Sequence, residues 1–322
     1  MLNSLKYRFL LLLGLVLFYN SCTKVNNDRL VNNQDIITDE NLYGITFINK
    51  DTGFICGGSR FSNGTILYTC DGGTTWKVRD SVSAYVLHGI KSIGNAIMSV
   101  GHTGKVVYSY GSKDSFSISQ IAGWEELYSL DVKDTLQLIV GGNSYGEGVM
   151  YRRKTDRSGD WDRLAMKQLL TDVTIVNDTL AFACGYGAIY RSEDAGKSWL
   201  LLNATGDFFK SIRFATAKTG YAVGYAGTIL KTTNAGHSWQ RLRNGNSLFN
   251  ANWYFNTLCV LDENHLFVAG NNGILLESTD GGKNWRKAVP FTDLNVNRLW
   301  LSADAHRMWM VSDHGGIHSL DL

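Results

Sequence analysis

The sequence lacks several features that define other classes of protein. It has a single proline, Pro290, in 322 residues, which excludes proline-rich linkers and collagen-like structure. It has almost no excess charge, with 31 basic and 29 acidic residues, so it lacks the electrostatic footprint of a nucleic-acid-binding protein. With 44% apolar and 12% aromatic residues, it can nevertheless bury a large core and is not a disordered chain.

The N-terminal apolar run is too short to cross a membrane. FLLLLGLVLF at 9–18 has ten residues, whereas a membrane-spanning helix needs about 20. Lys6 and Arg8 precede the run and small residues follow it, an arrangement typical of a secretory signal peptide over residues 1–21. Removal of this peptide would leave 29 basic and 29 acidic residues.

The sequence YNSCTK resembles the lipobox of bacterial lipoproteins, with Cys22 directly after the small Ser21. The resemblance implies that Cys22 is lipidated and anchors the mature chain to a membrane, because several acyl chains hold a protein there stably. The residue directly after the cysteine is Thr23, which resembles the sorting signal of outer-membrane lipoproteins. This resemblance implies an outer-membrane lipoprotein that is either periplasmic or surface-exposed. Residues 22–33 are expected to be a solvated tether. The alternative is an ordinary signal peptide with an unmodified Cys22.

The other cysteines are few and show no metal-binding or redox spacing. Cys56, Cys184 and Cys259 lie in apolar runs, so we expect them to be buried as small hydrophobic side chains. A Cys56–Cys70 disulfide is the alternative in an exported protein.

Seven heptapeptides align without gaps along the rest of the chain. Their starts are 39 to 46 residues apart, and their first and fourth positions are apolar in all seven. Mixed apolar runs of this length suit strands that are covered on both faces. The heptapeptides are LYGITFI (42–48), LHGIKSI (87–93), LYSLDVK (127–133), LTDVTIV (170–176), FKSIRFA (209–215), FNTLCVL (255–261) and VNRLWLS (296–302).

Two further strands follow every heptapeptide, and a third follows it in six of the seven units. A second apolar run ends, in six units, at Gly57, Gly101, Gly141, Gly185, Gly224 and Gly270. Another glycine opens a third run, which suggests a hairpin whose glycines adopt positive φ. A tryptophan marks the fourth strand at Trp76, Trp124, Trp161, Trp199, Trp239 and Trp285. Four short strands in a period near 42 predict an all-β, seven-bladed β-propeller.

The last unit lacks a fourth strand of its own, because the sequence stops at Leu322, just after its third strand. An unpaired edge is a liability, so a strand from elsewhere is expected to cover it. The segment QDIIT (34–38) is the predicted donor, which would pair with the last blade and close the ring. Residues 34–322 are therefore expected to form one monomeric propeller domain.

Four units carry a turn of fixed chemistry between the third and fourth strands. It occurs as TCDGGTTW (69–76), SEDAGKSW (192–199), TTNAGHSW (232–239) and STDGGKNW (278–285). The Asp or Asn accepts amide hydrogens of the turn, glycine takes the left-handed conformation, and tryptophan fills the gap between units. Structural roles, without calcium, are therefore expected for Asp71, Trp76, Asp194, Trp199, Asn234, Trp239, Asp280 and Trp285.

This turn resembles the Asp-box, or BNR, repeat. With GYAVGYAGTILKTTNAGHSW at 220–239, the chain is similar to the photosystem II stability/assembly factor-like propellers over about residues 42–322. The resemblance implies a propeller whose Asp-box turns lie on the face opposite a ligand site. Asp-boxes also mark sialidases, so a glycan-cleaving enzyme is the rival interpretation.

The interaction face is expected to collect the loops between second and third strands and between successive units. These loops present side chains that suit protein interfaces or stacking on sugars: Arg60, Phe61, His102, Tyr145, Tyr186, Tyr225, Asn271, His314, Trp253 and Tyr254. The alternative is that these aromatics only cover neighbouring blades. Lys91, Asp131 and Arg213 are expected to line the central channel, as an ionic network or a ligand site.

No catalytic constellation is apparent in the sequence. The Arg-Ile-Pro motif of sialidases is absent, and only Arg213 and Arg298 occur in the heptapeptides, whereas resemblance to a sialidase would require three arginines. Nucleophile-elbow, P-loop and zinc-protease motifs are also absent. We therefore expect no catalytic residues, no metal and no cofactor.

The patterns together predict a non-enzymatic, lipid-anchored propeller that serves as a protein-binding or assembly platform in the bacterial cell envelope. Its partners would be a membrane, through the lipid, and an unknown protein or glycan, but not nucleic acid. The alternative function is a glycan-binding or sialidase-like glycan-cleaving lipoprotein.

Overall fold

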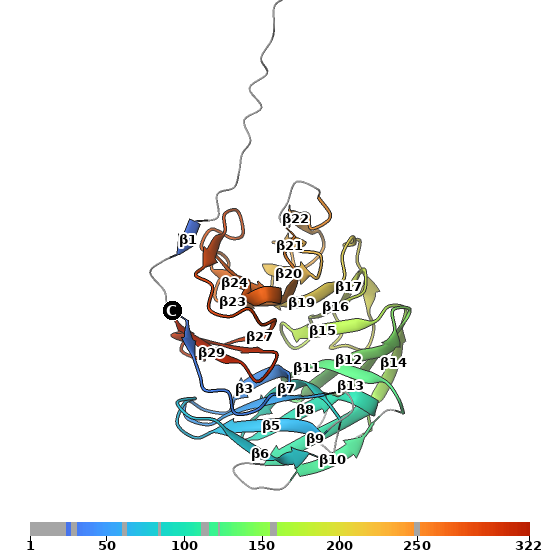
Figure 1. Cartoon of the computed structure of the whole chain (residues 1–322). Helices are drawn as coiled ribbons and strands as arrows, with labels where there is room; N and C mark the ends of the chain where they lie inside the picture. Colours follow the sequence, from blue (N-terminus) through green and yellow to red (C-terminus); the bar gives the residue numbers. More distant parts are fainter. Residues whose placement is uncertain are drawn as a thin grey trace, which may run out of the picture.

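The computed structural model describes residues 24–26, 31–59, 63–82, 85–110, 116–121, 123–154, 160–247 and 252–322. Seven antiparallel β-sheets are arranged as blades around a central axis (Figure 1). The predicted seven-bladed propeller is therefore confirmed. In the described ranges, the helical elements are two 3-10 turns, η1 (His102–Gly104) and η2 (Asn271–Gly273).

The first four blades each take their four strands from consecutive sequence. Blade 1 contains β3 (Leu42–Phe47), β4 (Gly53–Gly58), β5 (Gly64–Thr69) and β6 (Lys77–Val82). Blade 2 contains β7 (Leu87–Ile93), β8 (Ala96–Gly101), β9 (Lys105–Tyr110) and β10 (Phe116–Gln120). Blade 3 contains β11 (Glu126–Lys133), β12 (Leu136–Ser144), β13 (Glu147–Lys154) and β14 (Asp162–Met166). Blade 4 contains β15 (Leu170–Ile175), β16 (Ala181–Gly185), β17 (Ala188–Ser192) and β18 (Leu200–Leu201).

Blade 5 likewise takes its four strands from consecutive sequence, whereas blades 6 and 7 each also receive a strand from the N-terminus. Blade 5 contains β19 (Phe209–Phe214), β20 (Gly220–Gly224), β21 (Ile229–Thr232) and β22 (Gln240–Arg243). Blade 6 contains β23 (Phe255–Val260), β24 (Leu266–Gly270), β25 (Leu275–Ser278) and β26 (Arg286–Ala288), with β1 (Lys24–Asn26) beside β26. Blade 7 contains β27 (Val296–Leu301), β28 (Arg307–Ser312) and β29 (Ile317–Asp321), with β2 (Asn32–Asn33) as its outermost strand.

The ring is closed by backbone pairing between β2 and β29. Asn32 lies opposite Ser319 and Asn33 opposite His318, and the Gln34 amide donates to the carbonyl of Ile317 at 2.9 Å. On the inner side β27 packs against β3. Closure by an N-terminal strand is thus confirmed, but the predicted donor, 34–38, was wrong, because the pairing lies at residues 32–33.

The segment 22–33 is more than a tether. Lys24–Asn26 forms a parallel pair with Arg286–Ala288 of blade 6, and Asn32–Asn33 belongs to blade 7. The expectation of a fully solvated linker was wrong for these residues, because the outer edges of two blades offer unpaired backbone groups to which the segment can bond.

Every innermost strand has a β-bulge at the second residue of its heptapeptide. In blade 3, for example, Leu127 pairs with Gly141 and Ser129 with Val140, so Tyr128 is the extra residue of the bulge. The same shift occurs in the other six blades. A bulge re-aims the side chain of its extra residue.

The glycines that end the second strands are required by close packing. A Cβ on Gly270 would lie 1.8 Å from the carbonyl oxygen of Tyr254, and one on Gly141 would lie 1.9 Å from that of Glu126. Neither glycine has a positive φ. The expectation that this group of glycines supplies turn conformations was therefore wrong, because its role is to admit a neighbouring backbone.

The hydrophobic core lies between the blades. Leu42 and Ile45, the first and fourth residues of their heptapeptide, pack with Val311 and Ile317 of blade 7, and Trp76 belongs to the same cluster. Trp124 differs, because it follows β10 in the connection to blade 3 and is 83% exposed. Its assignment as a marker of the fourth strand was wrong.

In the described part of the chain, we find no helix with the length and apolar character that crossing a bilayer requires.

Candidate functional site

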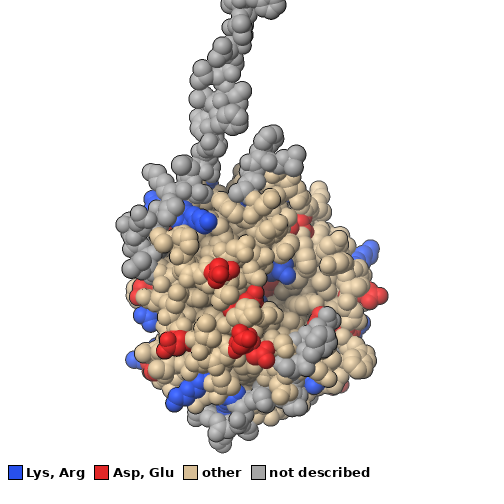
Figure 2. Space-filling view, in the orientation of Figure 1, with Lys and Arg blue, Asp and Glu red and all other residues tan. Residues whose placement is uncertain are grey.

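The propeller has two faces, because neighbouring strands of a blade run in opposite directions. We call "upper" the face with the connections between second and third strands and between successive blades. The "lower" face carries the other connections, including the Asp-box turns. Charged side chains of both signs are scattered over the side shown in the space-filling view, which is hollowed near its centre (Figure 2).

The Asp-box side chains make their hydrogen bonds within their own turns. Asp194 accepts from Ser192 Oγ at 2.8 Å and from the amide and hydroxyl of Ser198 at 2.9 and 2.6 Å. Asp71, Asn234 and Asp280 bond in the same way. Burial raises the pKa of Asp194, but these hydrogen bonds outweigh it and lower the pKa to about 2.

The Asp-box tryptophans pack beside these turns. The indole Nε1 of Trp199 donates to Gly196 at 3.1 Å and that of Trp285 to Gly282 at 3.1 Å. Trp239 lies edge-on to Phe182 and Phe214.

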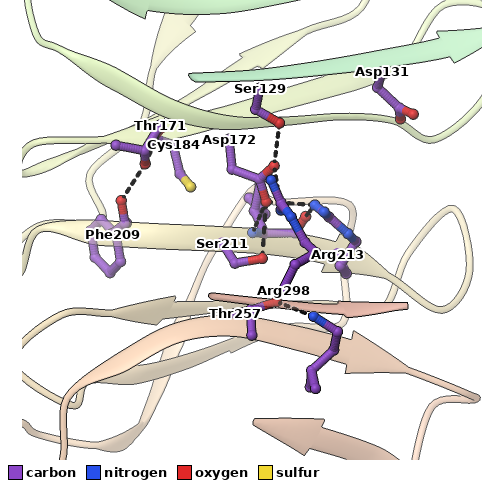
Figure 3. Close-up of polar contacts among 12 residues, drawn as sticks. Ser129, Asp131, Thr171, Asp172, Cys184, Phe209, Ser211, Arg213, Thr257 and Arg298 are labelled. Atoms are coloured by element: carbon purple, nitrogen blue, oxygen red, sulfur yellow. Dashed lines mark hydrogen bonds and ion pairs between the residues drawn. The ribbon is translucent and has the colours of Figure 1, made fainter. Parts of the chain in front are cut away.

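A buried carboxylate, Asp172 of β15, lies at the centre of the ring (Figure 3). Arg213 NH1 donates to it at 2.5 Å, and Arg298 NH1 lies 3.5 Å away. The other donors are Ser129 Oγ at 2.8 Å, Ser211 Oγ at 2.9 Å and the Ile212 amide at 3.1 Å. This one side chain therefore joins the innermost strands of blades 3, 4, 5 and 7.

Two guanidinium groups, those of Arg213 and Arg298, accompany the single carboxylate of Asp172. Burial raises the pKa of its carboxyl, but the charges of Arg213 and Arg298 outweigh this and lower the pKa to about 2. Lys91 pairs with Asp131 at 3.0 Å nearby. Lys91, Arg213 and Arg298 thus lie with Asp131 and Asp172 inside the channel, while at its upper end Lys210 lies near the carboxylates of Glu126 and Asp313, which bond to Tyr128 and Asn297.

A cavity of about 230 Å³, which we call the vestibule, opens at the upper end of the channel. Arg298 and the second residue of every heptapeptide line it: Tyr43, His88, Tyr128, Thr171, Lys210, Asn256 and Asn297. These seven are the bulge residues, so the bulges direct one side chain from each blade into the vestibule. Burial lowers the pKa of Lys210.

Half-exposed aromatic side chains continue from the vestibule onto the upper face. Tyr145 and Tyr186 stack with ring centroids 4.5 Å apart, and Phe208 lies edge-on to both. Lys210 Nζ is 4.8 Å from the centroid of the Phe208 ring, which links this aromatic group to the vestibule. Tyr145 is 60% exposed and Tyr186 45%, so both rings remain accessible.

A second aromatic group lies where blade 5 connects to blade 6. Tyr225 and Tyr254 have ring centroids 5.1 Å apart, and both are partly exposed. The guanidinium of Arg243 lies 4.8 Å from the centroid of the Trp253 ring and donates to the carbonyl of Gly227. The structure therefore places Tyr225 beside Tyr254, and Trp253 directly precedes Tyr254 in the same connection.

The remaining predicted face residues have polar partners. His102 Nδ1 is 3.0 Å from Glu126 Oε1, Asn271 Oδ1 accepts from Asn256 at 2.9 Å, and His314 Nδ1 is 3.0 Å from Asp39. Arg60, Phe61 and Cys22 lie outside the residues that the structure describes.

The vestibule was not predicted from the sequence. Its residues carry a signal nevertheless, because the second position of the heptapeptide is polar or aromatic in all seven units and never aliphatic. Lys210 and Arg298 are the two cations of this lining. Phe208 was missed as well, since it is the last residue of a connection and precedes its heptapeptide directly.

The vestibule offers mixed chemistry. Tyr128 donates to Glu126 at 2.7 Å, the kind of pair that a sialidase nucleophile needs, but only one arginine, Arg298, lines this cavity. In the described ranges, no three His, Cys, Asp or Glu side chains gather as a metal site. Cys56, Cys184 and Cys259 are buried and free, and Cys70 is exposed and free. The arrangement therefore suits noncovalent binding of an anionic, aromatic-contacting ligand.

Comparison with known proteins agrees with the repeat. The family model "Photosynthesis system II assembly factor YCF48" matches residues 202–319. Over these residues, which form blades 5 to 7, the chain is similar to this family. No curated protein matches the sequence.

Solved structures show the same fold at low sequence identity. "YCF48 bound to D1 peptide" is 18% identical with a TM-score of 0.73, covering 93% of this chain and 99% of that one. YCF48 from Cyanidioschyzon merolae is 16% identical with a TM-score of 0.69, covering 90% and 98%. The WD40 β-propeller domain of Doa1 is 9% identical with a TM-score of 0.66, covering 91% and 97%.

Proposed function

We propose that this protein is a non-enzymatic platform that binds a segment of a partner protein on its upper face. The observation that carries the proposal is the continuity between the cationic vestibule and the exposed pair Tyr145 and Tyr186, through Lys210 and Phe208. Accessible aromatic side chains beside a cation are typical of energetic hot spots at protein interfaces. The similar YCF48 structure with a D1 peptide supports a peptide-type ligand.

The charge of the vestibule favours a partner segment that carries a carboxylate. Lys210 and Arg298 line the cavity, whereas the carboxylates of Glu126 and Asp313 bond to the lining residues Tyr128 and Asn297. A partly buried cation interacts more strongly with an incoming anion than a solvated one does, because the local dielectric constant is lower. An acidic side chain or a C-terminal carboxylate would fit this environment.

A lipid anchor at Cys22 would orient the platform. β1 runs parallel to β26, so Lys24 lies beside Arg286, which directly follows the Asp-box tryptophan Trp285. A chain that reaches Lys24 from a membrane therefore arrives on the side of the lower face. The upper face would point away from the membrane, toward partners in the periplasm or outside the cell.

The binding proposal is tested by site-specific photo-crosslinking of the full chain in cell envelopes. A photoreactive phenylalanine analogue at Tyr186 should crosslink to a defined partner peptide, and Lys210→Gln should reduce the yield several-fold. The same analogue at Lys197, on the lower face, is the matched control. Equal crosslinking from both positions, or no effect of Lys210→Gln, would contradict the proposal.

The anchor is tested separately with Cys22→Ala. We expect the variant to lose incorporation of a labelled fatty acid and to leave the membrane fraction. Retention of both properties would show that the lipobox resemblance is misleading, without affecting the test of the upper face.

A further inference from the structure

A second cavity lies on the lower face, at the seam where the last blade meets the first. This seam pocket has a volume of about 410 Å³, within the range of about 300–1,000 Å³ that is common for small-molecule sites. Its lining includes Phe47, Lys50, Trp300, Asp304, Arg307 and Asp321. It is separate from the vestibule and shares no lining residue with it.

The aromatic wall of the seam pocket contains one ring more than an ordinary seam. Between blades 4 and 5, Phe182 and Phe214 stack and Trp239 lies edge-on to both. At the closing seam the same positions hold Trp309, Phe47 and Trp76 in the same arrangement.

The additional ring is Trp300, the fifth residue of its heptapeptide. The other six units have smaller or charged residues there: Thr46, Lys91, Asp131, Thr174, Arg213 and Cys259. Trp300 stacks on Phe47 with ring centroids 4.8 Å apart, and it remains only partly buried. Its ring packs against the core of this seam and also lines the seam pocket, so the part of the indole that faces the pocket can contact a ligand.

The polar rim of the seam pocket has balanced charge. Arg307 Nε donates to Asp321 Oδ1 at 2.7 Å, and both side chains are about half exposed or more. Asp304 accepts from Ser302 Oγ at 2.6 Å and from the His306 amide at 3.1 Å, which fixes its carboxylate at the rim. With Lys50, the rim offers two cations and two carboxylates. Such a rim gives little net attraction to a charged ligand but many donors and acceptors for hydroxyl groups.

We propose that the seam pocket binds an uncharged saccharide of one or two pyranose rings. The carbon face of a sugar ring would pack on the indole of Trp300, and its hydroxyls would bond to Asp304, Arg307 and Asp321. A concave aromatic wall with a few polar groups at fixed positions is the usual design of a small-ligand site. This inference is independent of the proposed function, because it concerns the opposite face.

The test is a titration of the full chain with maltose, cellobiose and N,N′-diacetylchitobiose. Binding is detected by tryptophan fluorescence and by saturation-transfer NMR. At least one disaccharide should bind saturably. Trp300→Leu should weaken its binding about tenfold, a typical value for loss of an aromatic contact. Asp321→Asn, at an exposed position that should not affect folding, should weaken it several-fold.

Trp124→Leu is the matched control, because it removes an exposed indole far along the chain from the seam pocket and should leave the affinity unchanged. Failure of all three disaccharides to bind at millimolar concentration would overturn the proposal. Affinity that is unaffected by both Trp300→Leu and Asp321→Asn, or tighter binding of glucose 6-phosphate than of the uncharged sugars, would also overturn it.

Discussion

Replacing Asp172 with Asn should destabilise the whole ring, because its carboxylate joins strands from four blades. The side chain is fully buried and contacts two guanidinium groups, at 2.5 and 3.5 Å. Asn has a similar shape but no charge, so it leaves Arg213 and Arg298 close together without a counterion. Breaking a buried ion pair by removing one partner costs about 3–5 kcal/mol.

For a domain of this size, 1 kcal/mol lowers the unfolding midpoint by about 2 °C, so Asp172→Asn should lower it by about 6–10 °C. Thermal unfolding followed by circular dichroism measures the change. Asp178→Asn, at an exposed position of the same blade, is the matched control and should lie within about 0.5 kcal/mol of the natural protein.

A second variant separates the loss of charge balance from a change in packing. Adding Arg298→Met to Asp172→Asn removes one of the two uncompensated cations, so the double variant should be more stable than Asp172→Asn alone. A midpoint for Asp172→Asn equal to that of Asp178→Asn would refute the reasoning. A double variant that is less stable than Asp172→Asn would show that repulsion between the arginines is not the cause.

Three further predictions concern acid stability, the close-packed glycines and the cysteines. Burial lowers the pKa of His318 to about 4. The stability that depends on its neutral form should therefore be fully present above the ordinary pKa of 6.5 and should fall as the pH drops from about 6.5 to 4. His318→Gln should flatten this part of a profile of unfolding free energy against pH. Gly185→Ala should destabilise the fold by about 2 kcal/mol or more in a urea titration, because the added Cβ would lie 1.8 Å from the carbonyl oxygen of Leu169. Gly146→Ala is the control and should be tolerated, because the space around Gly146 is open. Burial raises the pKa of Cys56 and Cys259 to about 12, whereas Cys70 is exposed. A thiol reagent should therefore label Cys70 in the folded protein, and Cys56 and Cys259 only after unfolding. Rapid labelling of Cys56 or Cys259 under native conditions would contradict the structure.

The sequence was sufficient to predict the blades because the repeat reports packing directly. The apolar first and fourth heptapeptide residues, such as Leu42 and Ile45, are the residues buried between blades. The strand that closes the ring was misplaced, because the ring is closed by backbone hydrogen bonds at Asn32 and Asn33, which require no apolar side chains. Ile36, which suggested a strand at 34–38, is 65% exposed.

The candidate site was only partly predictable for a similar reason. Loop position indicated Tyr145, Tyr186 and Tyr225, since the alternation of strands fixes which loops share a face. The vestibule depends on the bulges, whose conformation sends Lys210 and its equivalents inward. In a regular strand, neighbouring residues alternate between faces, so simple periodicity places these residues incorrectly.

The bulges also separate two demands on the same short strand. Because the extra residue of each innermost strand lies outside the ladder register, its side chain can change without altering the pairing of its neighbours. The toroid therefore displays seven such side chains around one opening, and three of them, Thr171, Asn256 and Asn297, also donate to a backbone carbonyl of the next blade. A substitution at one of these positions alters the chemistry of the opening, while the paired residues on either side of it keep the same ladder.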